Sequence, residues 1–527
     1  MTTLTGTGAM VRLVLRRDRI RLPVWVLAVV ALLMSSVASV LSLYASPAER
    51  RSYAVAVGDN PVAVMMGGPG AGLPSIGAIV VFEIAVLGYV AAGLMSALLV
   101  VRHTRAEEEA GRTELLRAGV VGRHAGLVAA LAVVAGANLA VGALMLAGSV
   151  ALGLPVVGAL ALAASLVAFG LVMAGVAAVA AQVTEHPRGA SGLAVAALGL
   201  FFVLRATGDV AESGLSWASP MGWALALRPF AEERWAVLVL PLVLGAGLVA
   251  AALALVDRRD VGAGLVSARP GRPTASRWLS GPLGLAVRQH RASLAGWAAG
   301  LLLLGLAYGS VGDSVEQLVS DNPDLAAFFA ASGTSLVDSF FAVAASFMAL
   351  IGAGFALQVA TRMRSEETAG RLEPLLGTAV PRWRWAASHL LVAVLGSTIV
   401  LGLAGLGLGL AHAVLTDDPA QVGRLTAAVL VYAPAVWTLI GVVAALFGLL
   451  PRAVGAVWAV LAVCAFLVLL GETLRLPDWT MDLSPFQHTP QLPAEAWSPG
   501  PLLMLVAVAA VLVAAGLVGL RRRDLTA

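Results

Sequence analysis

The sequence predicts an all-α membrane protein of about twelve transmembrane helices, arranged as two six-helix halves. Three observations predict this class. Of the 527 residues, 59% are hydrophobic and only 12% are charged, whereas soluble proteins carry roughly 25% charged residues. Apolar runs recur at the length of about 20 residues that a membrane-spanning helix needs. Short charged motifs also repeat in the same order in the two halves of the chain.

Each half contains six apolar segments of spanning length. The first run, PVWVLAVVALLMSSVASVLSLYA (23–45), is too long for the apolar region of a cleavable signal peptide, and no cleavage-site pattern follows it. We expect the spans of the first half near 22–44, 76–101, 125–153, 156–183, 190–208 and 236–256. We expect those of the second half near 294–312, 336–360, 386–414, 424–450, 453–471 and 501–520.

Arginine clusters predict the orientation of these helices. The chain has no lysine, and its arginines gather at the N-terminus, after the second span, in the mid-chain linker and at the C-terminus. If the spans alternate, these clusters fall on one side, which the positive-inside rule makes the cytoplasm. We therefore expect a multi-pass protein of the inner or plasma membrane with both termini cytoplasmic. Because the arginines lie between apolar runs, the net charge of +4 does not indicate nucleic-acid binding.

The repeat predicts the domain organisation: a first half (1–260), a cytoplasmic linker (261–282) and a second half (283–527). LVLRRDRIRLPVW (13–25) matches LAVRQHRASLAGW (285–297), and DRRDV (257–261) matches RRRDL (521–525). Because each half has an even number of spans, both lie the same way up in the bilayer. This is a parallel repeat, or pseudo-dimer, whose central pathway is expected at the interface between the halves.

One charge cluster occurs twice, after the second span of each half. RAEEEAGRTE (105–114) recurs as RSEETAGRLE (364–373). A continuous helix would pair Glu108 with Arg112 at i,i+4, which is worth only about 0.2–0.5 kcal/mol; Glu367 and Arg371 would pair in the same way. A solvated helix extension requires only charged side chains with weak pairings of this kind. It does not require the same charges at the same spacing in both halves, so the repetition of the cluster indicates a further role.

The glycine of each cluster, and Pro374 directly after the second cluster, predict a break in the helix. Glycine is the usual residue just past a helix end, and proline is favoured in a first turn. We therefore expect each extension to end near Gly111 or Gly370, and a short helix to begin near Glu114 or Glu373. Each half would then present a short charged helix at the cytoplasmic face, suited to contact with a partner.

These motifs resemble those of a known family. The pattern E-E-x-x-G-R-x-E-x-L after a second span, duplicated in two fused six-helix halves, resembles the permease subunits of type-two ABC exporters. R-A-T-G-D (205–209), W-A-S-P-M-G-W (217–223), R-P-F-A-E-E-R-W (228–235) and S-P-F-Q-H-T-P (484–490) are similar to the actinobacterial tetronasin-type branch, which exports polyketide antibiotics. The resemblance covers nearly the whole chain.

The resemblance implies a permease for hydrophobic or amphiphilic small molecules that works with a separate ABC ATPase, with two copies per permease chain. The short helices would be coupling helices that contact this ATPase. Arg-rich segments before the first and seventh spans (Arg12–Arg21 and Arg288–Arg291) would be amphipathic helices on the inner membrane surface. The implied ATPase contacts are Glu107, Glu108, Gly111, Arg112, Glu114, Glu366, Glu367, Gly370, Arg371 and Glu373.

No enzymatic site is expected in this chain. A phosphate-binding P-loop requires a lysine, and the sequence has none. ATP and Mg²⁺ would therefore be bound by the partner, with no cofactor on this chain. The seven histidines are scattered without metal-ligand spacing, and no catalytic constellation is found.

Three charged residues near or within the spans are candidates for the transport pathway: Glu83, Arg205 and Asp338. A charge inside a bilayer costs at least about 2.5–3.5 kcal/mol, so it should face a partner or a wet cavity. Glu83 is the deepest and is either a pathway group or a structural carboxylate. Arg205 and Asp338 are expected to reach the membrane interface. An ion-coupled secondary transporter that uses such carboxylates is the alternative function.

Overall fold

A computed structural model of the chain describes residues 3–58, 61–260, 262–266, 273–320, 335–470 and 477–523. Within these ranges all regular secondary structure is helical, and twelve helices are long and apolar enough to cross a membrane. The predicted twelve-span, all-α fold class is therefore confirmed. The chain divides into two compact units, Met1–Gly271 and Arg272–Ala527. The expected linker (261–282) is described only in part, since residue 261 and residues 267–272 lie outside the described residues.

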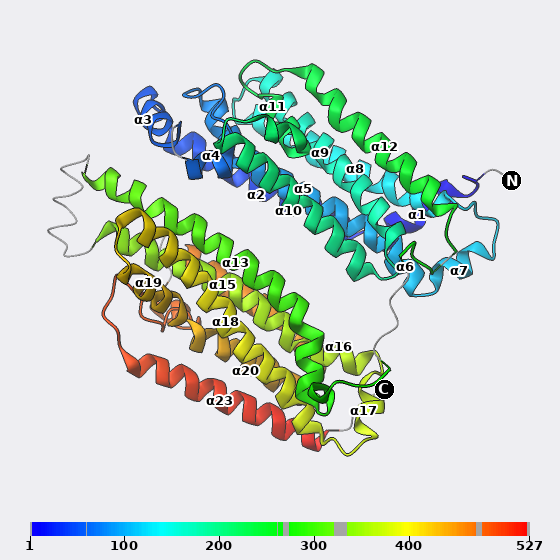
Figure 1. Ribbon diagram of the computed structural model, residues 1–527, viewed down its shortest axis with the longest axis vertical. Helices are drawn as coiled ribbons and strands as arrows, with labels where there is room; N and C mark the ends of the chain where they lie inside the picture. Colours follow the sequence, from blue (N-terminus) through cyan, green and yellow to red (C-terminus); the bar gives the residue numbers. More distant parts are fainter. Residues whose placement is uncertain are drawn as a thin grey trace. The chain divides into compact units, whose positions relative to one another are not determined.

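Unit 1 is a bundle of six long helices with short helices at both ends (Figure 1). The long helices are α2 (Arg21–Leu43), α5 (Ile76–His103), α8 (Ala125–Ala151), α9 (Val156–Val183), α10 (Pro187–Val210) and α12 (Val239–Val256). The short α-helices are α1 (Thr7–Arg17), α3 (Pro47–Gly58), α4 (Pro61–Gly67), α6 (Arg105–Glu109), α7 (Arg112–Arg117) and α11 (Pro220–Ala226).

Unit 2 repeats this order. Its spans are α13 (Pro282–Ser320), α15 (Leu336–Ala360), α18 (Arg382–Thr416), the pair α19 (Ala420–Leu430) and α20 (Ala433–Leu449), α21 (Val457–Leu470) and α23 (Pro499–Arg522). The short helices are α16 (Arg362–Thr368), α17 (Leu372–Leu376) and α22 (Asp478–Met481). The expected span near 424–450 is thus two helices, and Pro434 lies in the first turn of the second of them, where proline is favoured.

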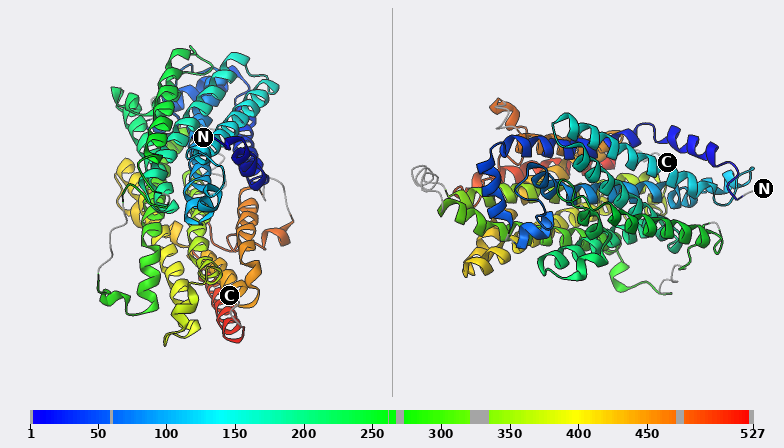
Figure 2. Two further views of the ribbon diagram at one scale, coloured as in Figure 1. Left: turned by 90° about the vertical axis from the view of Figure 1, so that its right-hand side faces the viewer. Right: turned by 90° about the horizontal axis from the view of Figure 1, so that it is seen from above.

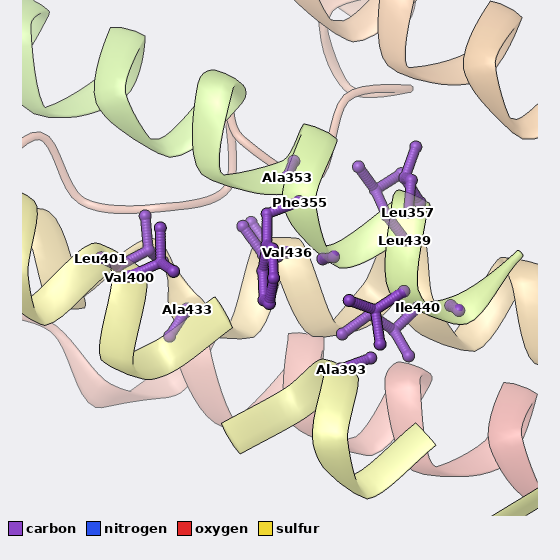
Figure 3. Packing of buried hydrophobic residues seen from close by; sticks show 14 of the residues in the cluster. Ala353, Phe355, Leu357, Ala393, Val400, Leu401, Ala433, Val436, Leu439 and Ile440 are labelled. Atoms are coloured by element: carbon purple, nitrogen blue, oxygen red, sulfur yellow. The ribbon is translucent and has the colours of Figure 1, made fainter. Parts of the chain in front are cut away.

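The second span is the most buried helix of each unit, and it begins in the same way in both. Ser75 accepts a hydrogen bond from the backbone N–H of Ala78 at the start of α5, and Ser335 accepts one from Asp338 at the start of α15. Such serine caps satisfy backbone N–H groups that the helix itself leaves free. In unit 2, Phe355 of α15 packs among side chains of α18 and α20 (Figure 3).

The two arginine-rich segments before the first and seventh spans differ. α1 is a separate helix, drawn in dark blue beside the N-terminus in Figure 2, and residues 18–20 separate it from α2. In unit 2, by contrast, Arg288 and Arg291 lie within α13, which runs unbroken from Pro282. The expectation of a separate amphipathic helix before the seventh span is therefore wrong: no helix-breaking residue interrupts 282–320, so the helix simply extends beyond its apolar part.

Candidate functional site

The duplicated cluster forms two similar loops at the ends of the second spans. We call residues 104–118 the first charged loop and residues 361–377 the second charged loop. In each, a short helix (α6 or α16) is followed by a glycine with positive φ and then by another short helix (α7 or α17). Gly111 has φ 69° and Gly370 has φ 67°, a region that side chains other than glycine's disfavour. The predicted break is confirmed at both positions.

The ion pairs across each break differ from those predicted. Arg112 Nε lies 2.7 Å from Glu107 Oε2, and Arg371 Nε lies 2.8 Å from Glu366 Oε2. The predicted pairs of these arginines with Glu108 and Glu367 are wrong. The i,i+4 rule assumes a continuous helix, whereas the left-handed glycine turns the chain so that the arginine reaches the glutamate five residues back. This hydrogen bond to Glu107 raises the pKa of Arg112.

The inner glutamate of the first charged loop lies between two arginines. The carboxylate of Glu108 is 2.5 Å from Arg105 Nη1 and 2.6 Å from Arg259 Nη2. All three side chains are at least nine-tenths buried. Arg105 also donates to the backbone carbonyl of Glu185, and Arg259 donates to the side chain of Gln182. The loop is thus tied to the ends of α9 and α12.

The inner glutamate of the second charged loop has the equivalent partners. Glu367 lies 2.9 Å from Arg364 Nη1 and 2.8 Å from Arg523 Nη1. Arg364 occupies the position of Arg105 in the repeat, and Arg523 that of Arg259. We call each set an arginine clamp. The matching sequences DRRDV and RRRDL signalled Arg259 and Arg523, but their role became visible only in three dimensions.

Burial separates the cluster into two groups of residues. Glu366 and Glu367 are only 4% exposed, and Glu108 is enclosed by its clamp, so these carboxylates shape the loops. The side chains available to a partner lie on α7 and α17. They include Arg112, Glu114 and Leu115 on α7, and Glu373 and Pro374 on α17, with Arg371 directly before α17.

The N-terminal helix is attached to the first charged loop through buried and exposed ion pairs. Arg17, at the end of α1, pairs with Glu107. The neighbouring Asp18 is fully buried and lies 3.1 Å from Arg102 Nη2 and 2.7 Å from His103 Nε2. α1 therefore contributes to the position of this loop, which the arginine pattern alone did not predict.

The two glycines offer a direct test of the loop geometry. A Cβ at Gly111 or Gly370 would meet no atom within 4 Å, so alanine there costs only the strain of positive φ, about 1 kcal/mol per site. We expect Gly111→Ala with Gly370→Ala to leave the spans folded but to speed hydrogen–deuterium exchange in α6–α7 and α16–α17. Gly119→Ala, at an ordinary φ in the same region, should leave exchange unchanged; equal effects would contradict the assignment.

Glu83 lies on α5 and is exposed. Its Oε1 accepts a 2.5 Å hydrogen bond from the Tyr53 hydroxyl on α3. Within the described residues, Glu83 forms no ion pair. Burial, together with this bond to Glu83, raises the pKa of Tyr53, so the phenol remains a proton donor.

The other two pathway candidates are held in local ion pairs. Arg205 is completely buried, 3.5 Å from Asp209 Oδ2 and stacked over the ring of Phe202. Arg205 is thus neutralised by the residue one helical turn further on, a spacing that the sequence already shows. Asp338 lies 2.6 Å from Arg424 Nη2. Among the described residues, no group of three or more His, Cys, Asp or Glu could hold a metal ion.

Twelve apolar spans, with charge concentrated in loops and at helix ends, define a multi-pass integral membrane protein. A family described as "Multidrug efflux system permease Rv1217c, C-terminal domain" matches residues 279–521. The multidrug efflux system permease protein Rv1217c of Mycobacterium tuberculosis (strain ATCC 25618 / H37Rv) is 41% identical over 529 residues, covering 99% of this chain and 95% of that protein. The chain therefore belongs to this family of efflux permeases.

Proposed function

We propose that the chain is the permease subunit of an ATP-driven exporter of hydrophobic or amphiphilic small molecules; the name of its relative supports the role of an efflux permease. It resembles the tetronasin-type branch, and export of polyketide antibiotics is the corresponding substrate hypothesis. A separate ABC ATPase, in two copies, would hydrolyse ATP with Mg²⁺ and contact α7 and α17. Both charged loops and both termini would lie in the cytoplasm.

One observation carries this proposal: the two charged loops repeat not only in sequence but in their ion pairs and glycine geometry. A loop that merely connected two spans would not require the same buried clamp in both units. Rigid, duplicated, charged projections suit two equivalent partner subunits. In the mechanism we propose, the ATPases close on ATP and draw the two loops together, and the halves move so that access changes from the inner leaflet to the outside.

Charge reversal on the exposed helices tests the docking role. We expect Glu114→Arg with Glu373→Arg to weaken binding of the ATPase at least about tenfold, because reversed charges at an interface repel the matching groups of the partner. Binding is measured by co-purification and titration of the ATPase onto the detergent-solubilised permease. Glu212→Arg is the matched control. It reverses an exposed charge just after the C-terminal end of α10, whereas the first charged loop contacts Glu185, just before the N-terminal end of that helix. Unchanged affinity in the double variant would contradict the coupling assignment.

Transport measurements then separate the two energy sources. In cells or vesicles depleted of ATP but holding a proton gradient, we expect export to stop. Export that persists under these conditions would favour the ion-coupled alternative, which is supported by Glu83, a carboxylate that forms no ion pair with the described residues.

A further inference from the structure

A groove opens in unit 1 between α2 and α5, toward the end of α2 that lies away from the charged loop. Its lining combines serine hydroxyls, two aliphatic side chains, a tyrosine and a carboxylate. The lining residues are Ser35, Ser36, Ser39, Val40, Leu43, Tyr44 and Glu83. The same position of the repeat, 259 residues later, is Ala342, so the carboxylate is present in only one half.

The serines of this groove use their hydroxyl hydrogens within their own helix. Ser35 and Ser36 donate their hydroxyl hydrogens to the backbone carbonyl of Leu32, and Ser39 donates to that of Ser35. A hydroxyl has a single hydrogen and two lone pairs. Because each hydrogen is used within α2, the oxygens can offer only lone pairs to whatever occupies the groove.

A carboxylate and an aromatic ring lie together in this groove, since Glu83 and Tyr44 both belong to its lining. Glu83 is exposed and has no basic partner among the described residues; its contact there is the Tyr53 hydroxyl. The rings of Tyr44 and Tyr53 lie with their centroids 4.7 Å apart, and Phe82 lies 6.1 Å from Tyr53. Ring faces attract cations, most strongly where water is excluded.

We propose that this groove binds the positively charged group of a cationic amphiphile, with Glu83 as its counter-ion. The proposal rests on the efflux function above and names the class of substrate. The serine lone pairs, the Tyr44 ring and a carboxylate without a basic partner among the described residues together favour a cation over an anion. Val40 and Leu43 supply apolar surface for the rest of an organic ion, which a metal ion would not need. We expect one such site per chain.

Two near-isosteric ions of opposite charge test this site. Purified full-length permease in lipid nanodiscs, without any ATPase, is titrated with radiolabelled tetraphenylphosphonium and, separately, tetraphenylborate. We expect the phosphonium to bind at one site per chain. The substitution Glu83→Gln should lower the affinity for the phosphonium at least about tenfold. Borate binding should not weaken with the substitution, because the loss of a negative charge removes a repulsion. Glu83→Asp, which retains the charge, should keep part of the affinity.

Asp338→Asn is the matched control, because that carboxylate starts the corresponding helix of unit 2 but is already neutralised by Arg424. It should bind the phosphonium as the unmodified chain does. Equal phosphonium affinity in the Glu83→Gln protein, or an equal loss of both ions, would overturn the proposal. Because no ATPase is present, this result is independent of the docking experiment; either proposal can fail while the other stands.

Discussion

Replacing Glu108 by alanine is expected to destabilise the permease by about 3–5 kcal/mol, the usual cost of leaving a buried charge without its partner. The substitution would leave Arg105 and Arg259, whose side chains are 1% and 5% exposed, facing each other without the carboxylate between them. Glu367→Ala should act in the same way on Arg364 and Arg523. These two substitutions should have larger effects than any change on the exposed faces of the charged loops.

The measurement is unfolding of the purified permease in mild detergent, combined with limited proteolysis of the two charged loops. Glu108→Ala should expose the first loop to protease and Glu367→Ala the second. Transport should be lost in both cases even where the spans remain inserted, since the loops no longer present α7 and α17 in a fixed position.

Glu109→Ala is the control for the first loop. Glu109 is the next residue in the chain, but its side chain is 56% exposed, and exposed ion pairs contribute at most about 1 kcal/mol. If Glu109→Ala and Glu108→Ala lowered stability equally, the clamp would have no special role. A stable Glu108→Ala protein that lost only ATPase binding would instead make Glu108 a direct docking residue.

The parts of the fold that follow from local rules could be predicted from the sequence. The bilayer demands about 20 apolar residues per helix, so spans are visible as composition. The break in each charged loop could be predicted because only glycine readily adopts the φ found at Gly111 and Gly370. The break between α19 and α20 was not predicted, although Pro434 was a signal for it, because a proline inside a helix removes a backbone hydrogen bond and kinks or breaks the helix.

The partners of the charged residues could not be predicted, for a physical reason. Glu108 meets Arg259 across 151 residues of sequence, because the end of α12 returns beside the end of α5. Spacing rules that assume one helix assigned Arg112 to the wrong glutamate. The exposure of the charged side chains could not be predicted from the sequence either. Arg205, at the end of an apolar run, is completely buried beside Asp209.

The clamp in unit 2 also depends on how closely two membrane helices approach. A Cβ added at Gly516 of α23 would lie 2.2 Å from the carbonyl oxygen of Ala444 on α20, far inside contact distance. Small residues permit such backbone contact, and membrane helices rely on it because lipid offers little hydrophobic driving force between them. α23 leads directly to Arg523, which holds Glu367.

Gly516→Val is therefore expected to separate α20 from α23, costing at least about 1–3 kcal/mol, and to withdraw Arg523 from Glu367. The second charged loop should become protease-sensitive while the first stays protected. Gly500→Val, the same change on the same helix at a position with no atom within 4 Å of the added Cβ, should leave both loops protected.

A double-mutant cycle shows whether packing and clamp are linked. If Gly516→Val acts on the loop through Arg523, then adding Arg523→Ala should produce little further loop exposure, because contacting elements that share one interaction do not add. Additive exposure would mean that the helix contact and the clamp support the loop independently. Non-additivity would mean that the close approach of α20 and α23 sets the position of the second charged loop, and through it the geometry of the surface proposed to contact the ATPase.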